Sequence, residues 1–278
     1  MARTEQPIGV SGEGLDQPVL FERDGAVAVL TLNRPKSVNA LSAEMLTALK
    51  EALAELQDDR SLRVVVLRAA GAHFCAGHNL KEMTARRADP DGGRAYFGAL
   101  FSLCAEVMTT IVRLPQPVIA EVSGVATAAG CQLVASCDLA VAGESARFAT
   151  PGVDIGLFCS TPMVALSRNV GRKHAMEMLL TGEMIPAERA EAMGLVNRVV
   201  ADDDLEAETR ALAARIAEKS PKAVKTGIEA FYAQAEMTLD QAYAYTGRVM
   251  AENMMARDAE DGIGAFIAKQ PMPEWSGE

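Results

Sequence analysis

The chain has 278 residues, 49% hydrophobic and 23% charged, a composition typical of a globular protein with one large core and an appendage. Its 27 lysines and arginines against 37 aspartates and glutamates give a formal charge of −10 without a basic run, which argues against a nucleic-acid or anionic-membrane partner. Five cysteines without a Cys-x-x-Cys pair predict reduced thiols and no metal site, and polar first residues with no apolar stretch of about 18 residues predict a cytoplasmic protein outside any membrane.

Residues 1–17 are rich in Gly, Glu, Ser and Gln and are expected to form a disordered tail. Two short β-rich runs follow, at 19–23 and 27–32. The dipeptide Asp24-Gly25 between them predicts a hairpin, so the chain is expected to open with antiparallel strands.

Helical and strand patterns then alternate. Ser42 predicts the cap of a helix, and a run of valines predicts a buried strand over 63–69. Further patterns predict a helix over 94–113, a strand over 118–122, a helix over 126–136 and a strand over 138–142. The body of the chain, residues 18–200, is therefore expected to be an α/β core.

The last part of the chain, residues 201–278, has a different pattern. Helical periodicity covers 204–219, 223–234, 239–256 and 258–269, without a convincing strand between them. We expect a C-terminal α-helical region joined to the α/β core.

Two glycine-bearing segments follow predicted strands and lead into predicted helices. They are residues 74–82 and 124–132. At such a point free backbone N–H groups can point at an anionic oxygen, and small residues let a ligand approach the backbone closely. The alternative is that both segments are packing turns, which are common in α/β proteins.

Seven motifs, taken in order along the chain, resemble the enoyl-CoA hydratase/isomerase family, also called the crotonase superfamily. They are Leu32-Asn33-Arg34-Pro35 with Asn39-Ala40-Leu41; residues 74–80; Pro117-Val118-Ile119-Ala120; residues 124–131; Cys137-Asp138-Leu139; Gly194-Leu195-Val196; and Ala265-Phe266 with Lys269. The resemblance implies a spiral of β-β-α units closed by a C-terminal helical oligomerisation region. It also implies acyl-CoA substrates and trimers or dimers of trimers.

Site residues follow from the same resemblance. The backbone N–H groups of His78 and Ala129 are the expected donors of an oxyanion hole for the thioester oxygen. The expected coenzyme A contacts are Arg34, Lys36, Ala40, Ala76, Gly77, Asn79, Leu80, Lys81, Phe266 and Lys269, although each cation can also be a solvated surface charge. Coenzyme A is part of the substrate, so no separate cofactor is expected.

One departure from the family pattern affects the chemistry. Hydratases of the family use two glutamates, at positions that hold Gln132 and Gly152 here, and neither residue transfers protons. In this respect the chain resembles the enoyl-CoA hydratase domain-containing branch, which lacks the glutamate pair. His78, with an ordinary pKa near 6.5, is the best-placed replacement acid or base, and Asp154 is a second candidate if residues 152–154 form a regular strand.

Two functions remain open from the sequence. The first is an acyl-CoA thioester enzyme of the hydratase or isomerase type, in fatty-acid or related acyl-CoA metabolism, with doubtful hydratase activity. The second is a non-catalytic acyl-CoA-binding or regulatory oligomer.

Overall fold

A computed structural model describes residues 16–278, so most of the expected tail at 1–17 lies outside the described residues. Its main sheet has six strands in the order β1-β2-β3-β4-β6-β9. β1 and β2 pair in antiparallel register, which confirms the predicted hairpin, and all other neighbours in this sheet are parallel. The strand bounds are β1 Val19–Asp24, β2 Val27–Leu32, β3 Val64–Ala69, β4 Val118–Val122, β6 Leu139–Gly143 and β9 Arg198–Val200.

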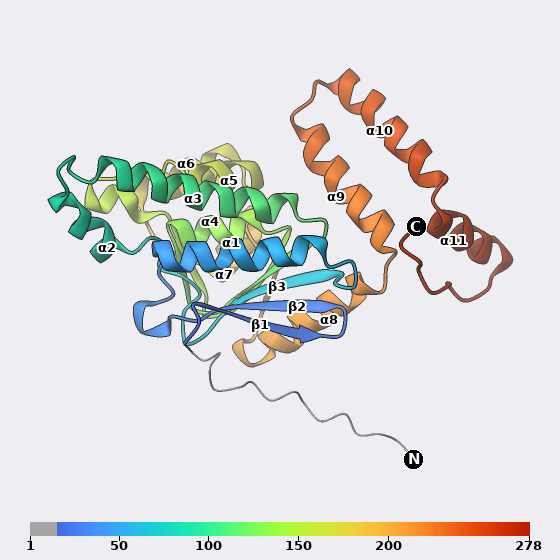
Figure 1. Cartoon of the computed structure of the whole chain (residues 1–278), viewed down its shortest axis with the longest axis horizontal. Helices are drawn as coiled ribbons and strands as arrows, with labels where there is room; N and C mark the ends of the chain where they lie inside the picture. The colour runs from blue at the N-terminus through green and yellow to red at the C-terminus, as the bar shows by residue number, and fades with distance from the viewer. Residues whose placement is uncertain (1–15) are drawn as a thin grey trace, which may run out of the picture.

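Alternation along β3 divides the interior into two layers. Val65 and Leu67 face the main core, whereas Val64 and Val66 face a second, smaller apolar cluster. Helices α1 (Ala43–Asp58), α3 (Arg94–Arg113) and α4 (Ala129–Ser136) cover the first face, and α8 (Leu205–Ala217) covers the second (Figure 1). Ser42 begins α1 as predicted, because its hydroxyl accepts a hydrogen bond from the Met45 N–H at 3.1 Å.

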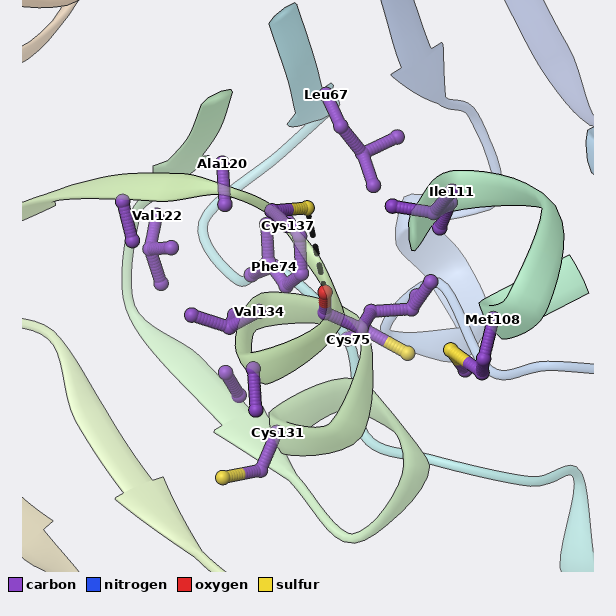
Figure 2. Close-up of a cluster of buried hydrophobic side chains, with 14 of the residues drawn as sticks. Leu67, Phe74, Cys75, Met108, Ile111, Ala120, Val122, Cys131, Val134 and Cys137 are labelled. Atoms are coloured by element: carbon purple, nitrogen blue, oxygen red, sulfur yellow. Dashed lines mark hydrogen bonds between the residues drawn. The ribbon is translucent and has the colours of Figure 1, made fainter. Parts of the chain in front are cut away.

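Small and sulfur-containing side chains fill the space between the sheet and α4. Figure 2 shows Cys131 and Val134 of α4 near Phe74, with Ala120 and Val122 of β4 on one side and Met108 and Ile111 of α3 on another. The Cys137 thiol donates to the Leu133 carbonyl at 3.2 Å. This packing brings α4 close to the segment that contains Cys75.

The predicted helix over 126–136 is wrong at its first residues. Val125–Thr127 form a short strand, β5, which pairs with β7 (Arg147–Ala149), and β7 in turn pairs with β8 (Ile185–Pro186). Helix α4 begins only at Ala129, after a turn at Ala128. The second, three-stranded sheet therefore ends beside the N-terminus of α4.

Several short elements connect these layers. They are η1 Pro35–Ser37, α2 Leu80–Ala85, η2 Arg86–Ala88, η3 Pro151–Ile155, α5 Pro162–Asn169, α6 Arg172–Thr181, α7 Ala187–Met193 and η4 Asp202–Asp204.

Helices α9 (Pro221–Ala235), α10 (Leu239–Met254) and α11 (Arg257–Ala268) form an arm that extends from the body (Figure 1). All four predicted C-terminal helices are present, but α8 packs on β3, β4 and β6. A division at residue 200 therefore separates α8 from the sheet that it covers, and the arm begins at α9. The Tyr232 hydroxyl on α9 fastens the arm to the body by donating to Asp138 Oδ1 at 2.7 Å.

Helix α3 corrects the expectation that no apolar stretch is long enough to cross a membrane. Within residues 16–278 it is the one helix that is long and apolar enough, by length and composition alone, to cross a membrane. In this structure it contacts α1 and α4, and its residues Leu100, Cys104, Val107, Met108 and Ile111 are buried. The face of α3 that carries these five residues therefore forms part of the core.

Candidate functional site

The two glycine-bearing segments lie side by side in parallel register. The Cys75 N–H donates to the Val125 carbonyl at 3.0 Å, and the Thr127 N–H donates to the Cys75 carbonyl at 2.9 Å. Cys75 is therefore paired with Ala126. Since His78 and Ala129 each follow this pair by three residues, the register brings the two turns to the same place.

Pairing on the opposite edge orients the His78 N–H. The Gly77 carbonyl accepts from the Leu41 N–H at 2.8 Å, and the Asn79 N–H donates to the Leu41 carbonyl at 3.2 Å. These two hydrogen bonds bracket His78, which is the residue paired with Leu41, so the N–H of His78 itself is not bonded to Leu41.

Gly77 allows the two turns to touch. A β-carbon on Gly77 would lie 2.9 Å from the Ala128 β-carbon and 3.2 Å from the Ala129 nitrogen. Gly130 has a similar role, because a β-carbon there would lie 2.2 Å from the Cys75 carbonyl oxygen. Both approaches require glycine.

Ala128 adopts a backbone conformation that is rare outside glycine. Its φ is 51° and its ψ −116°, while its N–H donates to the Ala149 carbonyl at 2.9 Å. Such strain persists only where surrounding contacts enforce it, and it is found mainly at functional sites. Here it ends β5 and starts α4, so that the next N–H, that of Ala129, lies at a helix N-terminus.

Neither the His78 nor the Ala129 N–H has a hydrogen-bond partner among residues 16–278. Strand pairing thus brings the two predicted donors close together, and no carbonyl of the described residues accepts a hydrogen bond from either. They are available to an acceptor oxygen on a ligand.

The His78 imidazole does not have the titration behaviour expected of an acid or base at neutral pH. Burial lowers its pKa from 6.5 to about 4. Its ring lies edge-on to Phe101, with 5.3 Å between centroids, and its Nε2 atom is buried without a partner. The expectation that His78 is well poised by its pKa is therefore wrong, because the side chain is neutral near pH 7.

Two buried, uncharged residues lie near Ala128 along the hydrogen-bonded backbone. Gln132 is 4% exposed, and its N–H donates to the Ala128 carbonyl at 3.0 Å. Thr150 is 1% exposed and directly follows Ala149, the residue that accepts the Ala128 N–H. Thr150 was not predicted from the sequence, because its position depends on the pairing of β5 with β7, a strand that the apolar pattern does not reveal.

Gly152 and Asp154 lie in η3, which is a 3-10 helix and not a strand. Asp154 therefore does not share a face with residue 152 as a strand would require; it is exposed and lies against Gly182 at the end of α6. A β-carbon on Gly152 would lie 2.8 Å from the Leu157 carbonyl oxygen and 2.9 Å from Cys159 Sγ. Burial also raises the pKa of the Cys159 thiol, which argues against a nucleophilic role.

A surface cleft of about 580 Å³ adjoins the first turn. It is lined by Arg34, Ser37, Ala40, Ser42, Glu44, Asn79, Lys81 and Glu82, so it brings together four of the residues predicted to bind coenzyme A. In this cleft the Arg34 guanidinium already forms an ion pair with Glu44, with 2.9 Å between Nη2 and Oε1. Lys81 and the neighbouring Lys36 form no ion pair within the described part of the chain.

Phe266 and Lys269 are not brought to this cleft. They belong to α11 and its C-terminal end, and Figure 1 shows α11 at the opposite end of the molecule from α2. Phe266 is 75% exposed. One copy of the chain therefore cannot present these two residues and Lys81 to the same small molecule. As for metals, the described residues contain no group of three His, Cys, Asp or Glu side chains that could hold one.

Comparisons with known proteins agree on one family. The profile of the enoyl-CoA hydratase/isomerase family matches residues 22–278. A protein of Xenopus laevis, the mitochondrial enoyl-CoA hydratase domain-containing protein 3, is 46% identical over 257 residues, which cover 92% of this chain and 85% of the relative.

Two crystal structures resemble the whole fold. An enoyl-CoA hydratase of Mycobacterium smegmatis has a TM-score of 0.89 at 54% identity, covering 92% of this chain and 98% of that one. Human enoyl-CoA hydratase domain-containing protein 3 has a TM-score of 0.87 at 43% identity, covering 92% and 99%.

Proposed function

Since this chain belongs to the enoyl-CoA hydratase/isomerase family, we propose that it binds an acyl-CoA thioester with the carbonyl oxygen between the His78 and Ala129 N–H groups. The observation that carries the proposal is the parallel pairing of Cys75 with Ala126. It brings two N–H groups without partners to one place, beside a cleft lined by Arg34 and Lys81.

Two backbone donors aimed at a thioester oxygen stabilise the enolate that forms when a proton leaves the neighbouring carbon. Removing one donor of such an oxyanion hole typically costs about 10²- to 10³-fold in rate. Because Ala128 and Gly77 hold the donors in place before the ligand arrives, little reorganisation is needed on binding. This supports an acyl-CoA enzyme of the hydratase or isomerase type.

The coenzyme A moiety would follow the cleft, with Lys36 and Lys81 as free cations for its phosphates. Phe266 and Lys269 would come from the arm of a second copy, because the arm of the same chain lies at the other end of the molecule. The exposed apolar side chains of the arm, including Leu239, Tyr243 and Met250, support such an assembly, a trimer or a dimer of trimers.

Proton transfer is the weaker part of the enzymatic proposal. Gln132 and Gly152 stand where hydratases of the family have glutamates, His78 is neutral, and Asp154 faces α6. An acid and a base each commonly contribute about 10²- to 10⁴-fold to such reactions. These observations favour a second candidate, a non-catalytic acyl-CoA-binding or regulatory oligomer.

Three measurements on the purified protein separate these functions. Titration with butyryl-CoA gives binding, and the infrared carbonyl stretch of ¹³C-labelled butyryl-CoA reports whether two donors polarise the thioester. NMR in D₂O then follows exchange at the carbon next to the thioester, together with hydration of crotonyl-CoA.

We expect binding with a lowered carbonyl frequency and exchange of the α protons. Binding with the lowered frequency but neither exchange nor hydration would leave the non-catalytic function. Absence of binding, or an unshifted carbonyl, would contradict the proposed oxyanion hole.

A further inference from the structure

Lys269 adopts a backbone conformation that favours glycine. It follows α11 as the cap of that helix, with a φ of 54° and a ψ of 38°. The Lys269 N–H donates to the Phe266 carbonyl at 3.2 Å. The Gln270 N–H donates to the Ala265 carbonyl at 2.9 Å, which completes a helix end where glycine is the usual residue. Left-handed strain outside glycine is found mainly at functional sites, so the position points to a use for the lysine side chain.

The chain after Lys269 runs back along α11 and forms what we call the strap, residues 270–278. Trp275 of the strap lies against the middle of the helix, since a β-carbon on Gly262 would be 3.0 Å from its indole ring. The Trp275 Nε1–H donates to the Glu218 carbonyl at 2.7 Å. Figure 1 shows the end of the chain beside α11. Lys269 thus stands at the turn between the helix and the strap.

Asp258 fastens the strap to the first turn of α11. Its Oδ1 atom accepts the N–H and the hydroxyl of Ser276, each at 2.8 Å, and its Oδ2 atom accepts the Gly277 N–H at 3.1 Å and the Ser220 hydroxyl at 2.5 Å. Burial acts to raise the pKa of Asp258, but the hydrogen bonds from Ser220 and Ser276 outweigh it and hold the pKa below its usual value. The strap is therefore held by an ionised carboxylate through charge-assisted hydrogen bonds.

The strap covers the buried part of α11. Within this helix, which the structure describes throughout, the buried residues are Asp258 and Gly262, and both meet the strap. Ile263, Phe266 and Ile267 are exposed. In a single copy α11 therefore has few buried apolar contacts of its own, and release of the strap would leave its far end, with Lys269, free to move.

From this arrangement we propose that Asp258 and Trp275 are positioning residues for Lys269, the cation that would hold a phosphate of coenzyme A bound in the cleft of a second copy. The inference rests on the proposed function, which supplies the ligand. It adds a role for the strap. Because the four-carbon stem of lysine is flexible, a fixed backbone direction at residue 269 reduces the conformational freedom lost when the ammonium meets a phosphate.

The test compares two ligands that share a thioester but not the nucleotide phosphates. Butyryl-CoA and butyryl-pantetheine are titrated by calorimetry into wild-type protein, Asp258→Asn and Trp275→Ala. We expect each substitution to weaken butyryl-CoA binding about fivefold or more and to leave butyryl-pantetheine within about twofold, because only butyryl-CoA brings phosphates to Lys269. Asp240→Asn is the matched control and should change neither, since Asp240 lies in the first turn of α10 but is exposed.

A double-substitution cycle separates positioning from a general weakening of the arm. If Asp258 acts through Lys269, Asp258→Asn should weaken butyryl-CoA binding by less than about twofold in protein that already carries Lys269→Asn. Trp275 is the single tryptophan of the chain, so its fluorescence reports whether the strap is docked. We expect emission at longer wavelength in Asp258→Asn, with the mass of the assembly unchanged by sedimentation.

The remaining outcomes contradict the inference. An emission shift without weaker butyryl-CoA binding would make the strap a purely structural feature, and an unchanged emission would show that Asp258 does not hold it. Equal losses for both ligands, additive effects with Lys269→Asn, or a smaller assembly would assign the effect to the fold or the oligomer. Failure of butyryl-CoA to bind the wild-type protein, or an unchanged affinity in Lys269→Asn, would instead refute the proposed function itself.

Discussion

Two separate features of the structure require glycine at position 77. Its φ of 87° belongs to the region that glycine adopts freely, and a β-carbon there would meet Ala128, Thr127 and Ala129. The first demand concerns only the backbone of this turn. The second concerns the distance between the two turns, and therefore the two free N–H groups.

A comparison of Gly77→Ala with Gly92→Ala should separate the effect of the positive φ from that of the close contact. We expect a loss of about 2–4 kcal/mol in the free energy of unfolding and at least tenfold weaker butyryl-CoA binding, because the β-carbon forces the turns apart. Denaturant unfolding and calorimetry measure both quantities. Gly92→Ala is the control, since Gly92 also has a positive φ, of 69°, but no atom near its β-position. Equal effects of the two substitutions on binding would contradict the role of close contact.

The buried His78 predicts a pH dependence of stability. In the folded chain its pKa is lowered from 6.5 to about 4, so between these values the unfolded state binds more protons than the folded state. The free energy of unfolding should therefore fall as pH falls from about 6.5 to about 4, by at most roughly 3 kcal/mol from this residue.

Urea unfolding at pH 7.5 and 4.5 measures this effect, with His78→Gln as the variant. The variant should lose less stability on acidification than the wild type. His174→Gln, on α6, should behave as the wild type does. Parallel losses in wild type and His78→Gln would show that the imidazole is not buried in its neutral form.

At the scale of elements, the half-buried carboxylate of Asp138 is one of the groups that hold α9 to the body. Asp138 Oδ2 accepts the Val118 N–H at 2.7 Å, and Oδ1 accepts the Tyr232 hydroxyl at 2.7 Å. Burial raises the pKa of Asp138, although both hydrogen bonds act to lower it. The carboxylate therefore depends on its two donors.

Tyr232→Phe removes one of these donors and should lower the free energy of unfolding by about 1–2 kcal/mol, because a half-buried charged acceptor is left with a single partner. Denaturant titration measures the loss. Tyr243→Phe on α10 is the control, since that side chain is 74% exposed, and it should change stability by less than about 0.5 kcal/mol. A similar loss in both variants would argue against a structural role for the Asp138–Tyr232 hydrogen bond.

Single elements were more predictable from the sequence than the contacts between them. The helix over 94–113 and the strand over 118–122 have the bounds that periodicity and the following prolines predict. The turn at Ala128 was not predicted, because a run of small residues has no period that distinguishes a three-residue strand from the first turn of a helix. Its true conformation is set by the Ala149 carbonyl, on a strand 21 residues further along.

The candidate site shows the same difference between single residues, which the sequence predicts, and contacts, which it does not. Motif resemblance predicted His78 and Ala129, and Arg34, Ala40, Asn79 and Lys81 do line one cleft. The neutral state of His78 and the burial of Thr150 could not be read from the sequence, because both follow from desolvation by elements distant in the chain. The 3-10 helix around Gly152 likewise packs against α6, an element that comes later in the chain.

At the scale of the whole molecule, the polar and apolar surfaces are unevenly distributed. The arm of α9, α10 and α11 carries many large exposed apolar side chains, among them Phe231, Leu239, Tyr243, Met250, Met254, Ile263, Phe266 and Ile267. Exposed apolar surface of this extent usually marks an interaction site. An arm that packs on another copy would also bring Phe266 and Lys269 to that copy's cleft.

A subunit-mixing experiment tests whether the binding site is shared between copies. Lys81→Gln and Lys269→Asn should each weaken butyryl-CoA binding about tenfold or more, because each removes a cation proposed to hold phosphate. When the two variants are refolded together, a cleft with intact Lys81 can meet an arm with intact Lys269. With random mixing about a quarter of the sites should then regain wild-type affinity, as expected for a head-to-tail ring.

The two variants refolded separately and then combined without exchange are the control and should show no tight sites. If the lysines act within one chain, co-refolding cannot restore any site, because every chain carries one of the two substitutions. Recovery of tight binding on exchange would therefore show that Lys81 and Lys269 meet between two copies, as the position of α11 at the far end of the molecule from α2 leads us to expect.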